Sequence, residues 1–192
     1  MEIALFGTSA DPPSIAHQQI LRWLGEHFAK CVVWVADNPF KQHQAGLAHR
    51  LAMMELTIRD LGSSYQNIEL HPEIADRRTI YTVEKAKELW QGADFYLVVG
   101  ADILPQLPKW YCAQDLLAQV KLLVIPRHGI EITPELLAPL GTTVTIAPAT
   151  IAPVSSTAYR HYHDPSLVVP AVAKYIEQAG LYQSALVSEA RK

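Results

Sequence analysis

Cysteine is scarce in this chain of 192 residues: Cys31 and Cys112 are the only two, and they lie far apart. No Cys-x-x-Cys pair is present, and the eight histidines are scattered without the spacing of zinc ligands. The sequence therefore predicts neither a disulfide framework nor a resident metal site. Cys31 stands in an apolar run, so we expect it to be a buried apolar side chain.

Charge is also limited, because charged residues make up 18% of the chain, the net charge is −3 and no long basic run is present. A surface that binds nucleic acid through its phosphates needs clustered Lys and Arg, so we expect no nucleic-acid partner. No apolar run reaches membrane-spanning length, and the start at Met1-Glu2 carries no basic leader. We therefore expect a cytoplasmic protein without a membrane partner.

The length of the chain suits one domain with a packed core. We expect this domain to cover residues 1–182. The composition turns polar after Leu181-Tyr182, so the tail 183–192 is expected to fray. The oligomeric state stays open at this point, a homo-oligomer included.

Apolar runs alternate with helical patterns along most of the chain. Several runs are continuously apolar, which is typical of parallel strands that are buried on both faces. The sequence thus predicts an α/β fold, namely a Rossmann-like, doubly wound parallel sheet with helices on both faces. The expected strands are 3–6, 31–36, 68–70, 94–99, 121–125 and 143–146, and the expected helices are 14–28, 47–61, 80–90, 116–119, 154–161 and 170–180.

Ligands of such sheets bind beyond the carboxyl ends of the strands. The loops that follow Phe6, Ala36, Val99 and Ile125 are therefore expected to converge. These loops hold nearly all of the unusual polar residues, so the sequence predicts a site where they meet.

The first of these loops leads directly into the start of a helix. A strand, a tight loop and a helix N-terminus together offer free backbone N–H groups to a phosphate. Ser14 and His17 are three residues apart at that helix start, so they share a face and can point at one ligand. The alternative is a helix cap at Ser14 with a surface histidine.

The segment from Gly7 to His17 resembles the signature Gly-x-x-Phe-Asp-Pro-x-His/Thr-x-Gly-His of the nucleotidylyltransferase superfamily. It departs from that signature at three positions. Ala10 replaces Phe, and Ala16 replaces Gly, which adds a methyl group where the substrate approaches. Ser14 replaces His or Thr and keeps a hydroxyl.

Motifs in the middle of the chain resemble the nicotinate-nucleotide adenylyltransferase family. Gly100-Ala101-Asp102, followed by Trp110-Tyr111 and Leu116-Leu117, follows the family's Gly-x-Asp and Trp-x-x-x-x-x-Leu/Ile-Leu. Tyr81-Thr82 follows its Ser-Tyr-Thr, with Ile80 in place of Ser.

This resemblance implies a binding site for the mononucleotide. The aromatic pair lies beside the pyridine ring, and N–H groups at a helix start near Thr82 receive the nicotinate carboxylate, with attraction from Arg77-Arg78 in front. A carboxylate directly after a strand suits the two hydroxyl donors of a ribose. The implied residues are Tyr81, Thr82, Gly100, Asp102, Trp110 and Tyr111.

Three further motifs resemble the parts of the same family that bind ATP. Residues 154–160 resemble its Ile-Ser-Ser-Thr-x-x-Arg, the loop 37–41 its Pro-x-Lys and residues 126–129 its Pro-Arg-x-Gly. A helix start with hydroxyls and a guanidinium one turn later suits phosphate oxygens. The resemblance implies that ATP and its phosphates are bound by Gly7, Thr8, Lys41, Arg127, Ser155, Ser156, Thr157 and Arg160.

The resemblance spans residues 3–182 and implies an enzyme of NAD biosynthesis. It would transfer AMP from ATP to nicotinate mononucleotide, giving deamido-NAD and pyrophosphate, with Mg²⁺ accompanying ATP. His17 would donate to the transferred phosphate, and Ser14 would assist from the same helix face. The alternatives are transfer to another phosphorylated acceptor, nicotinamide mononucleotide or phosphopantetheine, and a nucleotide-binding module without catalysis.

Overall fold

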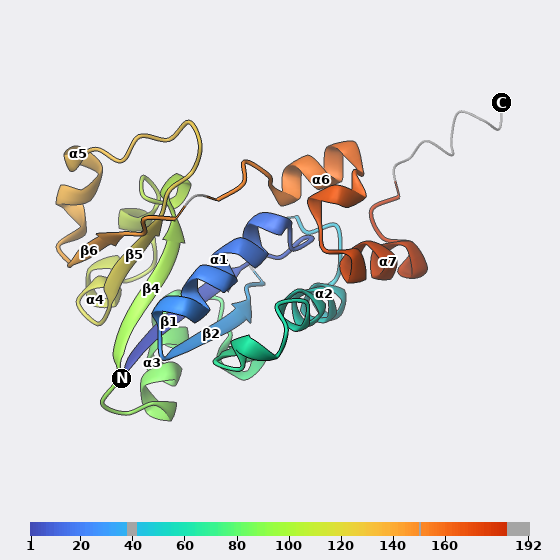
Figure 1. The fold of residues 1–192 in the computed structure, drawn as a ribbon. Coiled ribbons are helices and arrows are strands. Elements are labelled where there is room, and N and C mark those ends of the chain that lie inside the picture. The colour runs from blue at the N-terminus through green and yellow to red at the C-terminus, as the bar shows by residue number, and fades with distance from the viewer. Residues whose placement is uncertain (38–41, 150, 184–192) are drawn as a thin grey trace.

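The computed structural model describes residues 1–37, 42–149 and 151–183, and its fold is shown in Figure 1. Its strands are β1 (Glu2–Thr8), β2 (Lys30–Val35), β3 (Ile68–Leu70), β4 (Asp94–Gly100), β5 (Lys121–Ile125) and β6 (Val144–Ile146). Its α-helices are α1 (Ile15–His27), α2 (Leu47–Arg59), α3 (Thr79–Leu89), α4 (Ala113–Leu117), α5 (Pro134–Leu137), α6 (Ser156–Tyr162) and α7 (Pro170–Ala179). Single 3₁₀ turns cover Ser63–Tyr65, Pro72–Ile74, Ala101–Ile103, Leu107–Lys109, Ala138–Leu140 and Pro165–Leu167.

All six strands form one parallel sheet with the order β3-β2-β1-β4-β5-β6. From β1 the chain adds β2 and β3 on one side, and then β4, β5 and β6 on the other side. The strand order therefore reverses between β1 and β4, so these two strands flank the topological switch point at which ligands of such sheets bind. The predicted doubly wound, Rossmann-like α/β fold is confirmed.

Alternating side chains of the strands build a core on each face of the sheet. On β1, Ile3 and Leu5 face a cluster that includes α3 and α4, whereas Ala4 and Phe6 face a cluster that includes α1 and α2. Cys31 belongs to the second cluster and is fully buried, as predicted. Successive side chains of a strand point to opposite faces of the sheet, and both faces are buried here. Every position is therefore apolar, which explains the continuous apolar runs in the sequence.

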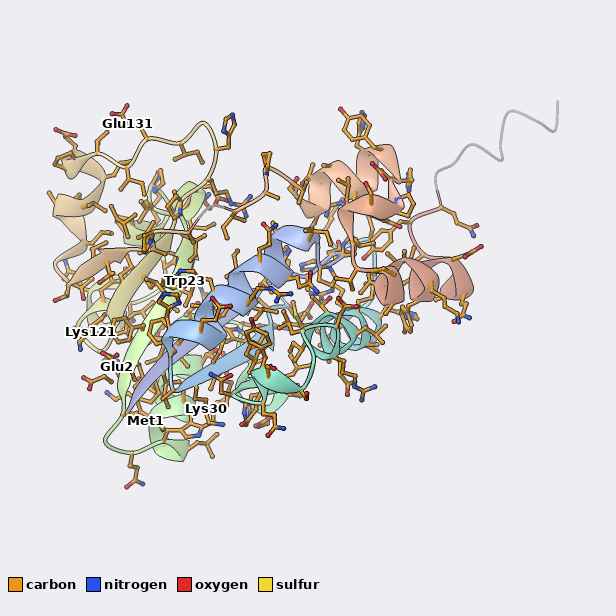
Figure 2. All side chains as sticks on the ribbon, in the orientation of Figure 1. Met1, Glu2, Trp23, Lys30, Lys121 and Glu131 are labelled. Carbon is orange, nitrogen blue, oxygen red and sulfur yellow. The ribbon has the colours of Figure 1, made fainter. Side chains whose placement is uncertain are left out.

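A third, smaller apolar cluster joins the two C-terminal helices to α2. Met53 of α2 packs with Tyr159 of α6, with Val172 and Ile176 of α7 and with Tyr182. Figure 1 shows α7 beside α2, and α6 next to α7. Figure 2 shows Met1, Glu2, Lys30 and Lys121, which stand at or next to the starts of β1, β2 and β5.

One helix prediction was wrong in its bounds, and one short helix was not predicted. The fourth helix begins at Ala113 rather than at residue 116, because Cys112 adopts a left-handed conformation with φ of 49° and ends the preceding turn. The short helix α5 was not predicted, since its four residues are too few to show a helical period. The predicted end of α7 at Gly180 is confirmed, with φ of 61° at that glycine. No helix in the described ranges is long and apolar enough to cross a membrane.

Candidate active site

His17 lies at the centre of the predicted site and is held from both sides of its ring. It is the third residue of α1, and its Nδ1 accepts the backbone N–H of Ser14 at 3.0 Å. The Ser14 hydroxyl lies 2.9 Å from the same nitrogen, and the Thr8 hydroxyl lies 2.9 Å from Nε2. A side chain at the third helical position that reaches back to the N-cap backbone is the second half of a capping box. Here an imidazole takes the place of the usual Glu or Gln.

Burial and a nearby positive charge determine the charge state of His17, and its hydrogen bond with Ser14 determines the tautomer. The residue is half-buried. Desolvation of the imidazole, followed by the positive charge of Arg127, lowers the pKa of His17 to about 4. The ring is therefore neutral near pH 7 and carries one proton. Because a backbone N–H can only donate, Nδ1 must accept, which assigns the proton to Nε2.

The structure brings Ser14 and His17 together as predicted, but in contact with one another. Ser14 is 1% exposed, and its hydroxyl faces the imidazole. Ser14 stands at the N-cap position of α1 and has an extended conformation directly before the helix.

Gly7 has a packing reason for its lack of a side chain. A Cβ at this position would lie 2.3 Å from Cζ2 of the buried Trp34 indole on the neighbouring strand β2. Gly7 therefore allows the Trp34 indole to pack directly against the backbone near the end of β1, next to the site.

The loop after β1 is anchored by a buried carboxylate that the sequence analysis did not single out. Asp11 is 3% exposed and accepts the N–H groups of Gln44 and Ala45 at 2.9 and 3.1 Å. It also accepts the phenol of Tyr182 at 2.7 Å. The loops after β1 and β2 are thereby joined to the segment that follows α7.

Arg50 of α2 is a second residue that the sequence did not predict, and it also joins the loops after β1 and β2. Its guanidinium is 1% exposed and donates to the carbonyl oxygens of Ser9 and Ala36, both at 2.9 Å, and of Ala45 at 3.1 Å. It also pairs with the Asp37 carboxylate at 2.6 Å. The signal that marks it in the sequence is a charge on the helix face that also carries the buried Met53, Met54 and Thr57.

The helix start of the Ser-Ser-Thr-x-x-Arg segment lies against the loop after β1. Ser155 caps α6, as predicted, by accepting the N–H of Ala158 at 3.1 Å. The Ser156 hydroxyl donates to the carbonyl oxygen of Pro12 at 2.7 Å. Arg160 donates to the carbonyl oxygen of Asp11 and, at 3.2 Å, to the Thr157 hydroxyl.

The loops after β4 and β5 meet through an ion pair. Arg127 Nε lies 2.9 Å from Asp102 Oδ1, and both side chains are partly exposed. A Cβ on Gly100 would lie 2.4 Å from the same carboxylate oxygen, so a larger residue there would shift the Asp102 side chain from this position. Asp11 and Arg50 join the loops after β1 and β2, and this ion pair joins those after β4 and β5. Because the charge of Arg127 also acts on His17, the four loops converge beyond the carboxyl ends of the strands.

The predicted aromatic residues of the mononucleotide site form a connected surface. The phenol of Tyr81 lies 3.4 Å from that of Tyr111, and both rings are exposed. The Arg78 guanidinium lies over the Tyr111 ring, 4.8 Å from its centroid. Hydrogen bonding with Tyr81, and then with Cys112, favours the protonated phenol and raises the pKa of Tyr111 to about 12. Trp110 packs partly against the core below.

Thr82 has a different place from its neighbours. It is fully buried, and its hydroxyl accepts the Asp76 N–H at 3.1 Å. The N–H groups of Tyr81 and Thr82 both donate to the carbonyl oxygen of Arg78. The helix N–H groups ahead of that first turn are those of Thr79 and Ile80, which precede the expected position near Thr82.

Lys41 lies outside the described residues. Within those residues, no group of three His, Cys, Asp or Glu side chains has the arrangement of a metal site.

A parallel sheet of order 3-2-1-4-5-6, with a neutral histidine and a helix N-terminus at its switch point, defines a nucleotide-binding domain of the nucleotidyltransferase class. Residues 5–162 match the cytidylyltransferase-like family. A relative from Synechocystis sp. (strain ATCC 27184 / PCC 6803 / Kazusa), named a probable nicotinate-nucleotide adenylyltransferase, is 40% identical over 95% of this chain and 100% of its own length. The nicotinate-nucleotide adenylyltransferase of Bacillus subtilis (strain 168) is 28% identical over 95% of this chain and 99% of its own length.

Among solved structures, the nicotinic acid mononucleotide adenylyltransferase of Plasmodium falciparum complexed with NaAD shares the fold. The superposition has a TM-score of 0.82 and covers 94% of this chain and 97% of that one, and the two sequences are 20% identical. The chain therefore belongs to the cytidylyltransferase-like family and, within it, to the nicotinate-nucleotide adenylyltransferases.

Proposed function

We propose that this protein transfers AMP from ATP to nicotinate mononucleotide, giving deamido-NAD and pyrophosphate. The observation that carries the proposal is His17, a neutral N–H donor held at a helix N-terminus at the sheet's switch point. The closely similar relatives named for this activity support the choice of reaction.

The reaction needs positioned donors rather than a protein nucleophile. A phosphate oxygen of the mononucleotide attacks the α-phosphorus of ATP in line, and the bond from that phosphorus to the pyrophosphate oxygen breaks. Charge develops on the oxygens around the α-phosphorus, where preorganised N–H and O–H donors lower the barrier. In the proposed reaction these donors come from the α1 N-terminus, Thr8 and His17.

In this proposal the phosphates of ATP are bound by the residues that the sequence predicted for ATP. Arg127 follows β5, and the cap of α6 presents Ser155, Ser156 and Thr157 with Arg160 one turn on. Ser156 and Arg160 already donate to the loop after β1, so they hold α6 against this site as well as offering donors to it. Lys41 completes the proposed set from outside the described residues.

Mg²⁺ accompanies ATP in the proposed reaction and neutralises phosphate charge. The described residues hold no cluster of three ligand side chains, so phosphate oxygens and water would supply most of its coordination.

The mononucleotide binds to the aromatic surface and to the loop after β4. The pyridine ring stacks on the flat faces of Trp110 and Tyr111, with Tyr81 beside them. The first N–H groups of α3, those of Thr79 and Ile80, receive its carboxylate, while Thr82 braces the turn in front of them. Asp102, which pairs with Arg127, accepts from the ribose hydroxyls.

An acceptor panel tests the proposal. Purified protein is incubated with MgATP and either nicotinate mononucleotide, nicotinamide mononucleotide or phosphopantetheine, and pyrophosphate release is measured. We expect the highest kcat/KM with nicotinate mononucleotide. A higher value with another acceptor reassigns the substrate, and release with none of the three leaves a binding module without catalysis. Placement in the cytosol and self-association remain proposals, which fractionation of the source cells and sedimentation of the purified chain would test.

A further inference from the structure

Trp34 carries a buried hydrogen-bond donor that the protein itself does not use. It is the penultimate residue of β2 and is 4% exposed, whereas the other three tryptophans are more accessible to solvent. Among the described residues, no group accepts a hydrogen bond from its indole N–H. A buried indole N–H ordinarily finds an acceptor. The nitrogen is not sealed from solvent, so this N–H is left to donate to a ligand.

The indole nitrogen lies on the ring edge that covers Gly7. A Cβ on Gly7 would lie 2.3 Å from Cζ2 and 2.4 Å from Cε2 of Trp34, and Nε1 is bonded to Cε2. Gly7 pairs with Trp34 in the sheet and directly precedes Thr8, the last residue of β1. The N–H therefore lies near the carboxyl edge of the sheet, where ligands of such folds bind.

Trp34 lies on the face of the sheet that α3 and α4 cover. Side chains alternate along β1, and Phe6 packs in the cluster that includes α1, so position 7 faces the opposite side. Trp34 belongs to the cluster on that opposite side, together with Ile80 of α3, and Trp110 packs against the same cluster. The N–H is therefore on the side of the residues proposed for the pyridine ring, and α1 is on the other side.

The group of the mononucleotide that suits this donor is its carboxylate. The donors proposed for the transferred phosphate, Thr8 and His17, belong to the end of β1 and to α1. The donors proposed for the carboxylate are the N–H groups of Thr79 and Ile80, and the buried apolar side chain of Ile80 adds none. A carboxylate has about four acceptor sites on its two oxygens and so accommodates a further N–H. An amide has one oxygen and an NH₂ group, so it accepts from fewer donors.

Resting on the proposed function, we propose that Trp34 is a specificity-determining residue, whose indole N–H donates to the carboxylate of nicotinate mononucleotide. The bond is charge-assisted with the acid and neutral with the amide, so it favours the acid. The carboxylate takes no part in the phosphoryl transfer. The bond therefore stabilises the ground state and the transition state alike, and its loss raises KM more than it lowers kcat.

Trp34→Phe tests the proposal, because it removes the N–H and keeps an aromatic ring over Gly7. We expect kcat/KM for nicotinate mononucleotide to fall by about 10- to 100-fold, mainly through KM, and that for nicotinamide mononucleotide by about 2- to 10-fold. The acid-to-amide ratio should therefore fall by about 5- to 10-fold. Trp90→Phe is the matched control, since Trp90 packs against the same cluster, and it should leave the ratio unchanged.

An NMR titration tests the contact without turnover. The four tryptophans give four indole N–H signals, and the signal of Trp34 is the one that Trp34→Phe lacks. If that variant does not fold, the signal is assigned by elimination with Trp23→Phe, Trp90→Phe and Trp110→Phe. Nicotinate mononucleotide without ATP should move the Trp34 signal downfield and slow its exchange with solvent. Nicotinamide mononucleotide should move it much less.

Two results would overturn the proposal: an unchanged acid-to-amide ratio in Trp34→Phe, or an unmoved Trp34 signal when the protein is saturated with nicotinate mononucleotide. An equal loss with both acceptors is the first of these results, and it would assign Trp34 to packing alone. Failure of the proposed function looks different, because the Trp34 signal then moves with nicotinate mononucleotide while no pyrophosphate is released. If this mononucleotide neither binds nor reacts, both proposals fail.

Discussion

The phenol of Tyr182 donates to the Asp11 carboxylate at 2.7 Å and so joins the end of the C-terminal region to the loop that precedes His17. The two residues stand 171 positions apart, and both are buried. Burial, and then the hydrogen bond to Asp11, raise the pKa of Tyr182, so this phenol donates throughout the physiological range. The C-terminal helices therefore brace the site as well as covering α2.

We predict that Tyr182→Phe loses about 1.5–3 kcal/mol of unfolding free energy, since the lost bond reaches a charged group. We also expect a several-fold lower kcat/KM, because Asp11 holds the loop that carries Thr8. Urea unfolding and steady-state kinetics on one preparation measure both effects. Tyr159→Phe, which removes a phenol from the same apolar cluster, is the control and should leave kcat/KM unchanged. Equal kinetics for the two variants would show that the bond to Asp11 does not influence the site.

For Ser14 we predict a modest kinetic effect. Ser14→Ala removes a hydroxyl from Nδ1 but keeps the backbone N–H that sets the tautomer, so kcat/KM should fall by about 2- to 10-fold, the size of one neutral hydrogen bond. Ser14→Thr should behave like wild type. ¹⁵N NMR of the imidazole should show Nε2–H in both. A lower melting temperature with unchanged kcat/KM would instead mean that Ser14 is only a helix cap.

The pKa of His17 predicts a pH dependence of stability. Since folding lowers this pKa from about 6.5 to about 4, the unfolded chain binds more protons between those values. Unfolding free energy therefore rises with pH across that window, is fully present above pH 6.5 and is lost as pH falls toward 4. The contribution is at most about 3 kcal/mol, and less to the extent that solvent reaches the ring. Urea midpoints of wild type should fall over this window more steeply than those of His17→Gln, and parallel curves would contradict the assignment.

Arg78 is predicted to favour the acid mononucleotide over the amide. Its guanidinium lies on the Tyr111 ring, and within the described residues it pairs with no carboxylate, since Asp76 pairs with Lys85. Arg78→Gln should lower the ratio of kcat/KM for the acid to that for the amide by about two- to fivefold, the range of an exposed charge pair. The effect should weaken at high salt. Arg77→Gln removes the same charge one residue away and should leave the ratio nearly unchanged, so an equal drop in both variants would mean that only net charge matters.

The sequence by itself determined the class of the fold and the positions of most of its elements. Continuous apolar runs separated by helical patterns specify a parallel sheet with helices on both faces, and these patterns are local. Gly180 ended α7 and Ser155 capped α6 where the sequence placed them, because caps depend on one or two residues. The motifs likewise lie at the carboxyl ends of strands, because the direction of the chain alone determines which end of a strand the following loop occupies.

Only the tertiary structure decided which groups meet. The partners of Asp11 lie more than thirty residues away, and the buried charge of Arg50 binds carbonyl groups, which no side-chain pattern reveals. Spacing brought Ser14 and His17 to one face of a helix, but distances and burial decided that the hydroxyl meets the ring.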